Sequence, residues 1–242
     1  MEREIMVRTS RSWRMPGYLL LAGMLATVLG SRGAAQTGDP TPESSVDVRI
    51  SLDGAPSMGD PEARVAVVEF ADYQCPYCRG HAIYTLPEII AHYVITGKIR
   101  YFFKDLPVES SHAGAFKVAE AARCAGEQVK YWEMHDHLMR NPTFVSELPK
   151  YALDLNLSVP EFQLCLDSGM VAAKIRADIQ ESKQAGVRGT PSFFVGALDS
   201  QSTSMHAVTM IYGAQPYAIF RDVLDRMIAS DEKGGSEANA RP

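Results

Sequence analysis

Two cysteines with the spacing Cys-x-x-Cys are the residues of this sequence best suited to chemistry. Cys75 and Cys78 enclose Pro76 and Tyr77, and they closely follow an apolar, β-branched run at 64–71 that predicts a buried strand. Proline is favoured in the first turn of a helix, so a helix is expected to begin at Pro76. Unpaired backbone N–H groups at that end of a helix stabilise an anion, and we therefore expect a lowered pKa for Cys75. Cys78, one turn further in, is expected to be less exposed and to resolve mixed disulfides.

A structural disulfide or half of a zinc site would use the same residue types as a redox pair. A four-cysteine zinc site needs a second close pair, whereas the remaining cysteines, Cys124 and Cys165, lie about forty residues apart. His81 would complete a Cys-x-x-Cys-x-x-His cluster, but we place it on the first helix near the edge of the site. Redox chemistry is therefore favoured, and we expect no metal and no cofactor other than the redox-active disulfide.

Glu69 is the second polar residue that attracts attention. It lies inside the apolar run, six residues before Cys75. A carboxyl group buried there has a raised pKa, because burial disfavours its charged form. It could then pass protons to and from Cys78. The alternative is that the alternation of the strand turns Glu69 outward to solvent, and of the two we favour the proton relay.

A Gly-Thr-Pro-Ser segment at 189–192 precedes a predicted strand. Proline is tolerated at the first position of a strand. If the Thr190–Pro191 bond is cis, the backbone of Thr190 could face the dithiol and pair with the extended chain of a substrate. The alternative is a simple turn at the start of the strand, which this segment taken alone favours.

Strands and a helix alternate around these residues. Apolar and polar residues alternate over 46–51, which predicts a half-buried strand, and a further strand is predicted at 98–103. The helix that begins at Pro76 is expected to kink at Pro87. Its predicted apolar face consists of Ile83, Leu86, Ile90 and Tyr93. Strand, helix and strand together form a β-α-β unit.

A helical block and a second group of strands follow. Asn-Pro, Ser and Gly breaks divide the block into five predicted helices, at 112–126, 128–140, 145–156, 160–167 and 170–185. Ser158 and Glu161 form a capping-box pattern for the fourth of them. Strand patterns return at 192–195 and 207–212, and a last helix is predicted from Pro216. The predicted fold class is therefore α/β, with a block of helices inserted into a split domain.

The first 35 residues have the pattern of a secretory signal. Scattered arginines precede an apolar run at 18–29, and small residues follow, with cleavage expected after Ala35. An uncleaved N-terminal anchor is the alternative, and both place the globular part outside the cytoplasm. Four cysteines, an even number, favour disulfides there. The formal net charge is −5 and there is no basic run, so nucleic acid is not an expected partner.

The sequence resembles DsbA-like thiol–disulfide oxidoreductases of the BdbD-related branch over about residues 46–230. The matching segments, in order, are VEFADYQCPYC at 68–78, LP at 106–107, HA at 112–113, AEAARCA at 119–125, YWEMH at 131–135, GTPSFFV at 189–195 and GAQPY at 213–217. The resemblance implies a thioredoxin-like fold with an inserted all-helical subdomain and a cis-proline loop that faces the dithiol. It also implies that Cys75 attacks, Cys78 resolves and Glu69 handles protons. The substrate-facing residues are then Pro76, Tyr77, Thr190 and Pro191.

Six parts of the chain follow from these patterns. They are a signal peptide or anchor at 1–35, a lead-in and edge strand at 36–60, a first thioredoxin-like part at 61–108, a helical insertion at 109–186, a second thioredoxin-like part with the cis-proline loop at 187–230, and a disordered tail at 231–242. Cys124 and Cys165 both fall in the insertion, where we expect a structural disulfide. Two buried thiols, or a redox-sensitive bond that tunes the first site, are the alternatives.

The expected protein is a periplasmic or otherwise extracytoplasmic oxidase that donates its Cys75–Cys78 disulfide to reduced, unfolded secreted proteins. A membrane protein of the DsbB or VKOR type would re-oxidise it. A glutaredoxin is disfavoured, because 116 residues separate Cys75 from Pro191. Only about 25 residues lie between the expected cleavage site and the core strand, too few for the dimerisation domain of secretory isomerases, so a monomer is expected. A reductase or isomerase of the same fold, and a peptide-binding chaperone, are the alternatives.

Overall fold

The computed structural model describes residues 42–141 and 144–239. The chain divides into two units, Met1–Asp39 and Pro40–Pro242, and all described residues belong to the second. The signal peptide or anchor predicted at 1–35 therefore lies outside the described residues. Within the described part of the chain, no helix is both long enough and apolar enough to cross a bilayer.

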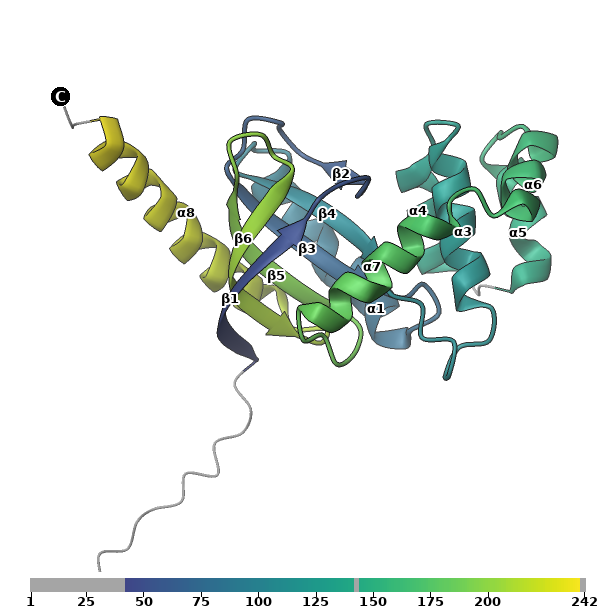
Figure 1. The fold of residues 1–242 in the computed structure, drawn as a ribbon, viewed down its shortest axis with the longest axis horizontal. Helices are drawn as coiled ribbons and strands as arrows, with labels where there is room; N and C mark the ends of the chain where they lie inside the picture. The colour runs from purple at the N-terminus through teal and green to yellow at the C-terminus, as the bar shows by residue number, and fades with distance from the viewer. Residues whose placement is uncertain (1–41, 142–143, 240–242) are drawn as a thin grey trace, which may run out of the picture. The chain divides into compact units, whose positions relative to one another are not determined.

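A six-stranded mixed sheet forms the centre of the second unit (Figure 1). Its strands are β1 (Glu43–Ser51), β2 (Ser57–Met58), β3 (Val65–Ala71), β4 (Ile99–Asp105), β5 (Ser192–Leu198) and β6 (Ser204–Tyr212), in the order β1-β6-β5-β3-β4-β2. β3 and β4 run parallel, and the other neighbouring pairs are antiparallel. Every residue of β3 is buried, as in a strand covered on both faces. The predicted β-α-β unit is confirmed, whereas β2 is too short to show a pattern in the sequence.

The helix after β3 changes type along its length. Its segments are α1 (Pro76–Gly80), the π-helical η1 (His81–Thr85), α2 (Leu86–Ile89) and the π-helical η2 (Ile90–Val94). Pro87 has no N–H to donate, and the helix is wider on both sides of it, with the Leu86 N–H bonded to the carbonyl of His81. A π turn takes in one extra residue and rotates those beyond it. The α-helical period predicts that Ile90 is buried, but after the first π turn Ile89 is buried in its place. Two π turns thus stand where the sequence predicts a kink at Pro87.

Helices cover both faces of the sheet. On one face, α2, η2 and α8 (Tyr217–Asn239) pack against the strands. This apolar layer includes Val67, Leu86, Ile89, Phe193, Phe220 and Leu224. On the other face, α7 (Ala172–Gln184) contacts β4 and crosses in front of the sheet in Figure 1. Alternate residues of a strand point to the same face of the sheet, so the side chain of Glu69 points to the same face as that of Val67. This is the face that α2 and α8 cover.

The prediction of a disordered tail at 231–242 is wrong for residues 231–239. α8 continues through this segment to Asn239. Asp231 accepts a hydrogen bond from the guanidinium of Arg64, with 3.2 Å between Oδ1 and Nε. The polar composition of the segment therefore does not prevent a helix.

The helical insertion is confirmed. Besides α7 it contains α3 (Ala115–Gly126), α4 (Tyr131–Arg140), η3 (Val145–Glu147), α5 (Leu148–Asp154) and α6 (Val159–Ser168). The capping box predicted for α6 is wrong: Ser158 is the N-cap residue, but its side chain makes no capping hydrogen bond. The Ser158 N–H donates to Oε1 of Gln128 at 2.8 Å, so it is not available to Glu161.

A disulfide joins Cys124 in α3 to Cys165 in α6, which is the pairing expected from the sequence. Both residues are buried in the apolar core of the insertion. The bond spans 41 residues of chain. A loop of that length, closed in the unfolded state, corresponds to about 4 kcal/mol of stabilisation on chain-entropy grounds. The bond therefore holds α3 and α6 of the insertion together.

A buried cluster of charges fastens the insertion to the sheet. Lys104 and Asp105 at the end of β4, Arg123 in α3 and Asp178 in α7 are all at most 5% exposed. The Lys104 ammonium lies 2.6 Å from Oδ1 of Asp178, and Arg123 contacts Asp105 and Asp178 at the same distance. Glu181 of α7 also pairs with Lys104 at 2.6 Å. Three elements far apart in the sequence are thus held together by one ionic group.

Candidate active site

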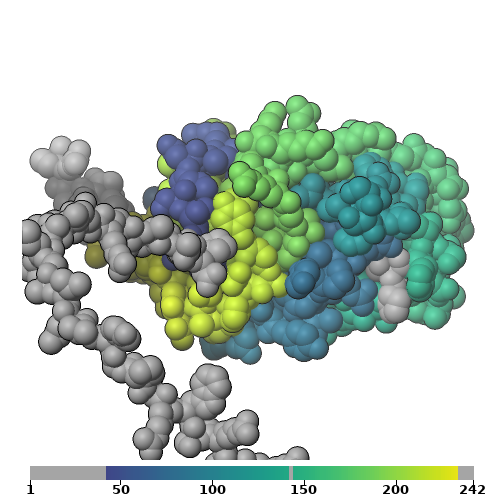
Figure 2. Space-filling model, turned by 90° about the horizontal axis from the view of Figure 1, so that it is seen from below, coloured from purple at the N-terminus to yellow at the C-terminus, as the bar shows by residue number. Residues whose placement is uncertain are grey.

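The Cys-x-x-Cys pair lies where β3 passes into the following helix. Cys75 is the N-cap residue of α1 and has an extended backbone. Both cysteines are free thiols, Cys75 being 5% exposed and Cys78 fully buried. In Figure 2 the blue segment that contains α1 lies at the surface, between the yellow-green C-terminal strand region and the teal helices of the insertion. Only Cys75 is therefore positioned to meet a partner.

The cis-proline loop faces this dithiol, as the resemblance implies. The Thr190–Pro191 peptide bond is cis. The sulfur of Cys75 lies 3.4 Å from the backbone carbonyl oxygen of Thr190, although 115 residues separate the two in the sequence. Tyr77, between the cysteines, is 71% exposed. The structure thus brings the predicted substrate-facing residues and the attacking thiol to one place.

The two cysteines have opposite pKa shifts. A hydrogen bond from the Cys78 thiol lowers the pKa of Cys75 to about 5; Thr190 and the backbone N–H groups of Tyr77 and Cys78 add to this, and burial opposes it. Burial, together with the hydrogen bond to Cys75 and the negative charge of Glu69, raises the pKa of Cys78 well above its usual range. At neutral pH the reduced site therefore holds a thiolate at Cys75 and a thiol at Cys78.

Glu69 is buried beside the dithiol, so the alternative of an outward-facing carboxylate is wrong. It is 1% exposed, because both faces of β3 are covered. Burial raises the pKa of the Glu69 carboxyl to about 8; a hydrogen bond from Tyr101 opposes this shift, and the nearby charge of Cys75 adds to it. The Tyr101 hydroxyl donates to Oε2 of Glu69 at 2.7 Å. A carboxyl group that titrates near neutral pH is suited to exchange protons with a thiol.

Tyr101 and His81 are polar partners of this site that the sequence does not reveal. His81 is buried, not at the edge of the site, and its ring packs 4.4 Å from Phe193 and 5.1 Å from Phe220. Its Nε2 atom lies 3.2 Å from the hydroxyl of Tyr101. Tyr101 lies at a core-facing position of β4, so the sequence predicts an ordinary core residue. Its hydroxyl reaches Glu69 only because of the register in which β3 and β4 pair.

The turn between β3 and α1 is held by Asp72. Its Oδ1 atom accepts the N–H of Gln74, and its Oδ2 atom accepts the N–H of Val108, both at 2.8 Å. Oδ2 also lies 2.8 Å from Nδ1 of His112. His112 thus binds the turn that presents Cys75.

Comparison with known proteins identifies the family. The family model described as Thioredoxin (Thioredoxin_4) matches residues 51–211, more than half of the chain. The chain belongs to this family. The thioredoxin fold with its helical insertion is also that of two crystal structures. BdbD from Bacillus subtilis, in its oxidised form, is 19% identical with a TM-score of 0.63, over 76% of this chain and 98% of BdbD. The alpha-DsbA1 protein of Wolbachia pipientis is 21% identical with a TM-score of 0.61, over 75% of this chain and 94% of the other.

Curated relatives of this thioredoxin-family protein include antiporters and a disulfide bond formation protein. The Na(+)/H(+) antiporter NhaA 3 of Salinispora tropica is 36% identical over 157 residues, which are 63% of this chain and 24% of the antiporter. The chain therefore spans about a quarter of the length of that relative. The probable disulfide bond formation protein D of Bacillus anthracis is 27% identical over 154 residues, covering 57% of this chain and 68% of the relative. The resemblance to DsbA-like oxidoreductases is confirmed.

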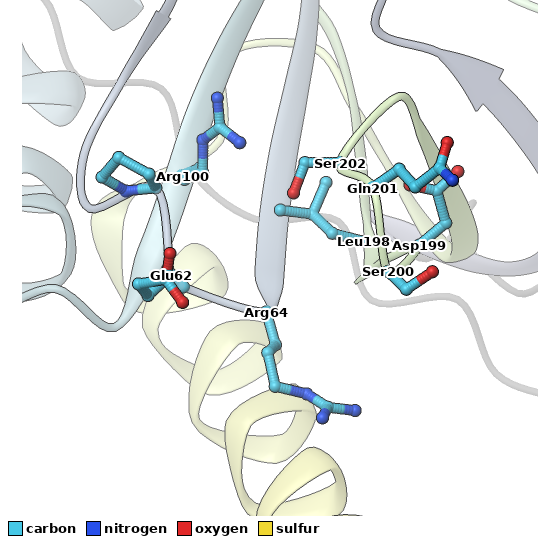
Figure 3. A pocket seen from close by; sticks show the side chains of 10 residues that line it. Glu62, Arg64, Arg100, Leu198, Asp199, Ser200, Gln201 and Ser202 are labelled. Carbon is cyan, nitrogen blue, oxygen red and sulfur yellow. The ribbon is translucent and has the colours of Figure 1, made fainter.

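A cavity at the other end of β3 lacks the chemistry of the dithiol. It has a volume of about 650 Å³ and is lined by residues before β3 and by the turn between β5 and β6. Figure 3 shows the guanidinium of Arg64 pointing away from this turn, along α8. Within residues 42–141 and 144–239, no group of three or more His, Cys, Asp or Glu side chains is arranged to hold a metal ion. The thioredoxin-type dithiol is therefore the site that the chemistry of the described residues favours.

Proposed function

We propose that this protein is an exported thiol–disulfide oxidase that donates the Cys75–Cys78 disulfide to reduced secreted proteins. A substrate thiolate attacks the sulfur of Cys75, the Cys75–Cys78 bond breaks, and Cys78 leaves and takes a proton from Glu69. A second substrate thiolate then attacks the substrate sulfur of the mixed disulfide and releases Cys75 as a thiolate. Two electrons pass from the substrate dithiol to the protein, and the substrate gains one disulfide.

The observation that carries this proposal is the position of Cys75 at the N-cap of α1, where the Cys78 thiol and backbone N–H groups lower the pKa of its thiol. A pKa of about 5 in place of 9 stabilises the reduced form. At pH 7 this amounts to roughly 3 kcal/mol, or roughly 60 mV in the potential of a two-electron couple. A dithiol stabilised in this way makes the disulfide a stronger oxidant, which suits donation rather than reduction.

The position of the site supports the partners that belong to this proposal. The backbone of Thr190 beside Cys75 is placed to pair with an extended substrate segment, and Pro76 and Tyr77 lie exposed next to it. A reduced, unfolded secreted protein offers such a segment. A membrane re-oxidase of the DsbB or VKOR type would restore the disulfide. The arginine-rich, apolar N-terminal pattern favours a location outside the cytoplasm.

The first test is the equilibrium potential of the Cys75–Cys78 pair at pH 7 in glutathione buffers, followed by thiol trapping. We expect a value near about −120 mV, that of a disulfide that is readily given away. A value near about −270 mV would replace the oxidase with a reductase or isomerase. A serine variant of both Cys124 and Cys165 is the control, because its trapped thiols report the active-site pair alone.

The same potential, measured from pH 4 to pH 8, tests the pKa of Cys75. Above pH 5 the reduced site keeps Cys75 as a thiolate, so reduction takes up one proton for two electrons. The potential should then rise by about 30 mV for each unit by which the pH falls, and by about 60 mV below pH 5, where both thiols are protonated. A slope of about 60 mV throughout would mean an ordinary thiol at Cys75. Glu69→Gln should keep the break near pH 5, since Cys75 sets it.

A further inference from the structure

A chain of buried polar groups leads away from the dithiol. Glu69 in β3, Tyr101 in β4 and His81 in η1 are each at most 1% exposed. The hydroxyl of Tyr101 donates its hydrogen to Glu69 Oε2 at 2.7 Å. His81 Nε2 must therefore be the donor in its 3.2 Å contact with the tyrosine oxygen, because that hydroxyl has no second hydrogen. The three groups form one directed series of hydrogen bonds that ends on the carboxylate.

Both ends of this series are open. Oε1 of Glu69 and Nδ1 of His81 are buried and have no hydrogen-bond partner among the described residues. Buried polar atoms without partners are uncommon and cost free energy, so two at the ends of one chain require an explanation. The Glu69 end lies beside the dithiol, since Glu69 raises the pKa of Cys78. The other end is a ring nitrogen that is free to accept a proton.

We propose that Tyr101 and His81 form a proton wire that connects Glu69 with solvent, an inference that rests on the proposed thiol–disulfide exchange. One proton enters at Nδ1 of His81, the Nε2 proton passes to Tyr101, and the tyrosine proton passes to Glu69. The Tyr101 hydroxyl then points back toward Nε2, and release of a proton follows the same steps in reverse. One proton enters and one arrives at the carboxyl, so no net charge stays on His81 or Tyr101.

We place the solvent end of the wire at a cavity beside the helix that carries His81. This cavity has a volume of about 580 Å³ and is lined mainly by apolar residues of η1, α2, η2 and α4, among them Ala82, the neighbour of His81 in the chain. His135 of α4 also lines it, and its Nε2 atom has no partner among the described side chains and backbone groups. His135 lies close enough to His81 for its charge to lower the pKa of His81. In the proposed wire, protons would enter from this cavity and not from the substrate-facing surface at Cys75.

The titration behaviour of the neighbouring groups suits such a wire. The groups that face it are Cys75 and Cys78 from α1 and His135 from α4. Burial, with a smaller contribution from His135, lowers the pKa of His81 to about 3, so its ring stays neutral at every working pH. Burial raises the pKa of Glu69 to about 8. The histidine therefore changes its tautomer, not its charge, when the carboxyl group gains or loses a proton.

Histidine NMR on the reduced, full-length protein tests this directly. With ¹⁵N-labelled histidine, the His81 signals can be assigned through contacts with the rings of Phe193 and Phe220. We expect the ring proton on Nε2 when Glu69 is ionised and on Nδ1 when Glu69 is neutral, with one midpoint for both changes. Glu69→Gln should abolish the switch. A His81 tautomer that stays constant while Glu69 titrates would overturn the wire.

Kinetics supply a second readout. Tyr101→Phe removes the central hydroxyl and should slow the release of Cys78 during reaction with a substrate dithiol about tenfold, less than the loss of a general acid itself, because Glu69 is retained. Tyr131→Phe is the matched control: it removes a buried hydroxyl 3.0 Å from that of Tyr73, outside the wire, and should change the rate less than twofold. Equal rates for the two variants would also overturn the wire. The NMR measurement needs no substrate, so it tests the wire separately from the proposed function. A protein that shows the tautomer switch but no disulfide exchange would contradict the oxidase function and not the wire.

Discussion

Cys75→Ala is expected to abolish disulfide exchange, whereas Cys78→Ala should leave a protein that captures substrates but does not release them. In Cys75→Ala the remaining thiol is fully buried, and its pKa stays well above its usual range through burial. The thiolate is the reacting species, so the exchange rate should fall by at least about a hundredfold. In Cys78→Ala the Cys75 sulfur still reacts at the surface, but no second sulfur resolves the mixed disulfide.

Reaction with a disulfide-bonded peptide, followed by non-reducing electrophoresis and mass spectrometry, measures both outcomes. Cys78→Ala should accumulate a stoichiometric adduct at Cys75, and Cys75→Ala should form none. We expect the Cys124–Cys165 bond to stay unchanged in both variants. Retention of more than a tenth of the exchange rate by Cys75→Ala would contradict its role as the attacking thiol. Unchanged suppression of aggregation by that variant, with activity lost, would favour a peptide-binding chaperone.

The dithiol and the strand before it could be predicted because their signals are local. Proline after Cys75 predicts the helix start, and an unbroken apolar run predicts a strand covered on both faces. Both are features of neighbouring residues, and burial of Glu69 follows from the second. The contact of Cys75 with Thr190 spans 115 residues, and only the family resemblance makes it predictable.

The polar partners of Glu69 could not be predicted, because they depend on how the helix is rotated and how the strands are aligned relative to one another. The π turn that begins at His81 rotates the residues after it, so the apolar face predicted from those residues does not include His81. Its ring nevertheless packs against Phe193 and Phe220 in the core. A shift of one residue in the register of β3 and β4 would move Tyr101 to the other face of the sheet. No pattern within one segment carries that information.

The buried charge cluster escapes sequence analysis for a related reason. The strand predicted at 98–103 ends where polar residues begin, but β4 continues through Lys104 and Asp105. Polar residues at the end of a strand are normally solvated. Here their partners are Arg123 and Asp178, and Asp178 lies 74 residues beyond Lys104. Their burial becomes visible only once α3 and α7 are placed against the sheet.

Arg123→Met is expected to destabilise the protein by about 3–5 kcal/mol, the usual cost of breaking a buried ion pair by removing one partner. Arg123 is 5% exposed and contacts both Asp105 and Asp178 at 2.6 Å. Without it, Asp178 keeps only Lys104, which also pairs with Glu181, and Asp105 loses the cation that contacts it. Chemical unfolding of the variant and of the parent protein measures the difference. Arg140→Met is the matched control: its 2.6 Å pair with Asp136 is exposed, so it should cost less than about 1 kcal/mol.

The loss of stability should also grow with pH, because Asp105 titrates. Burial raises the pKa of Asp105 to about 6, although Arg123 opposes that shift, so removal of the guanidinium raises the pKa further. A carboxyl group whose pKa is higher in the folded than in the unfolded state loses stability as the pH rises toward the folded value. Arg123→Met therefore continues to lose stability above pH 6, whereas the parent protein does not. The difference in unfolding free energy between the two proteins should be larger at pH 8 than at pH 5. Asp105→Asn in the Arg123→Met background should recover part of the loss at pH 8. A penalty that is independent of pH, or no greater than that of Arg140→Met, would show that the cluster does not hold the insertion to the sheet.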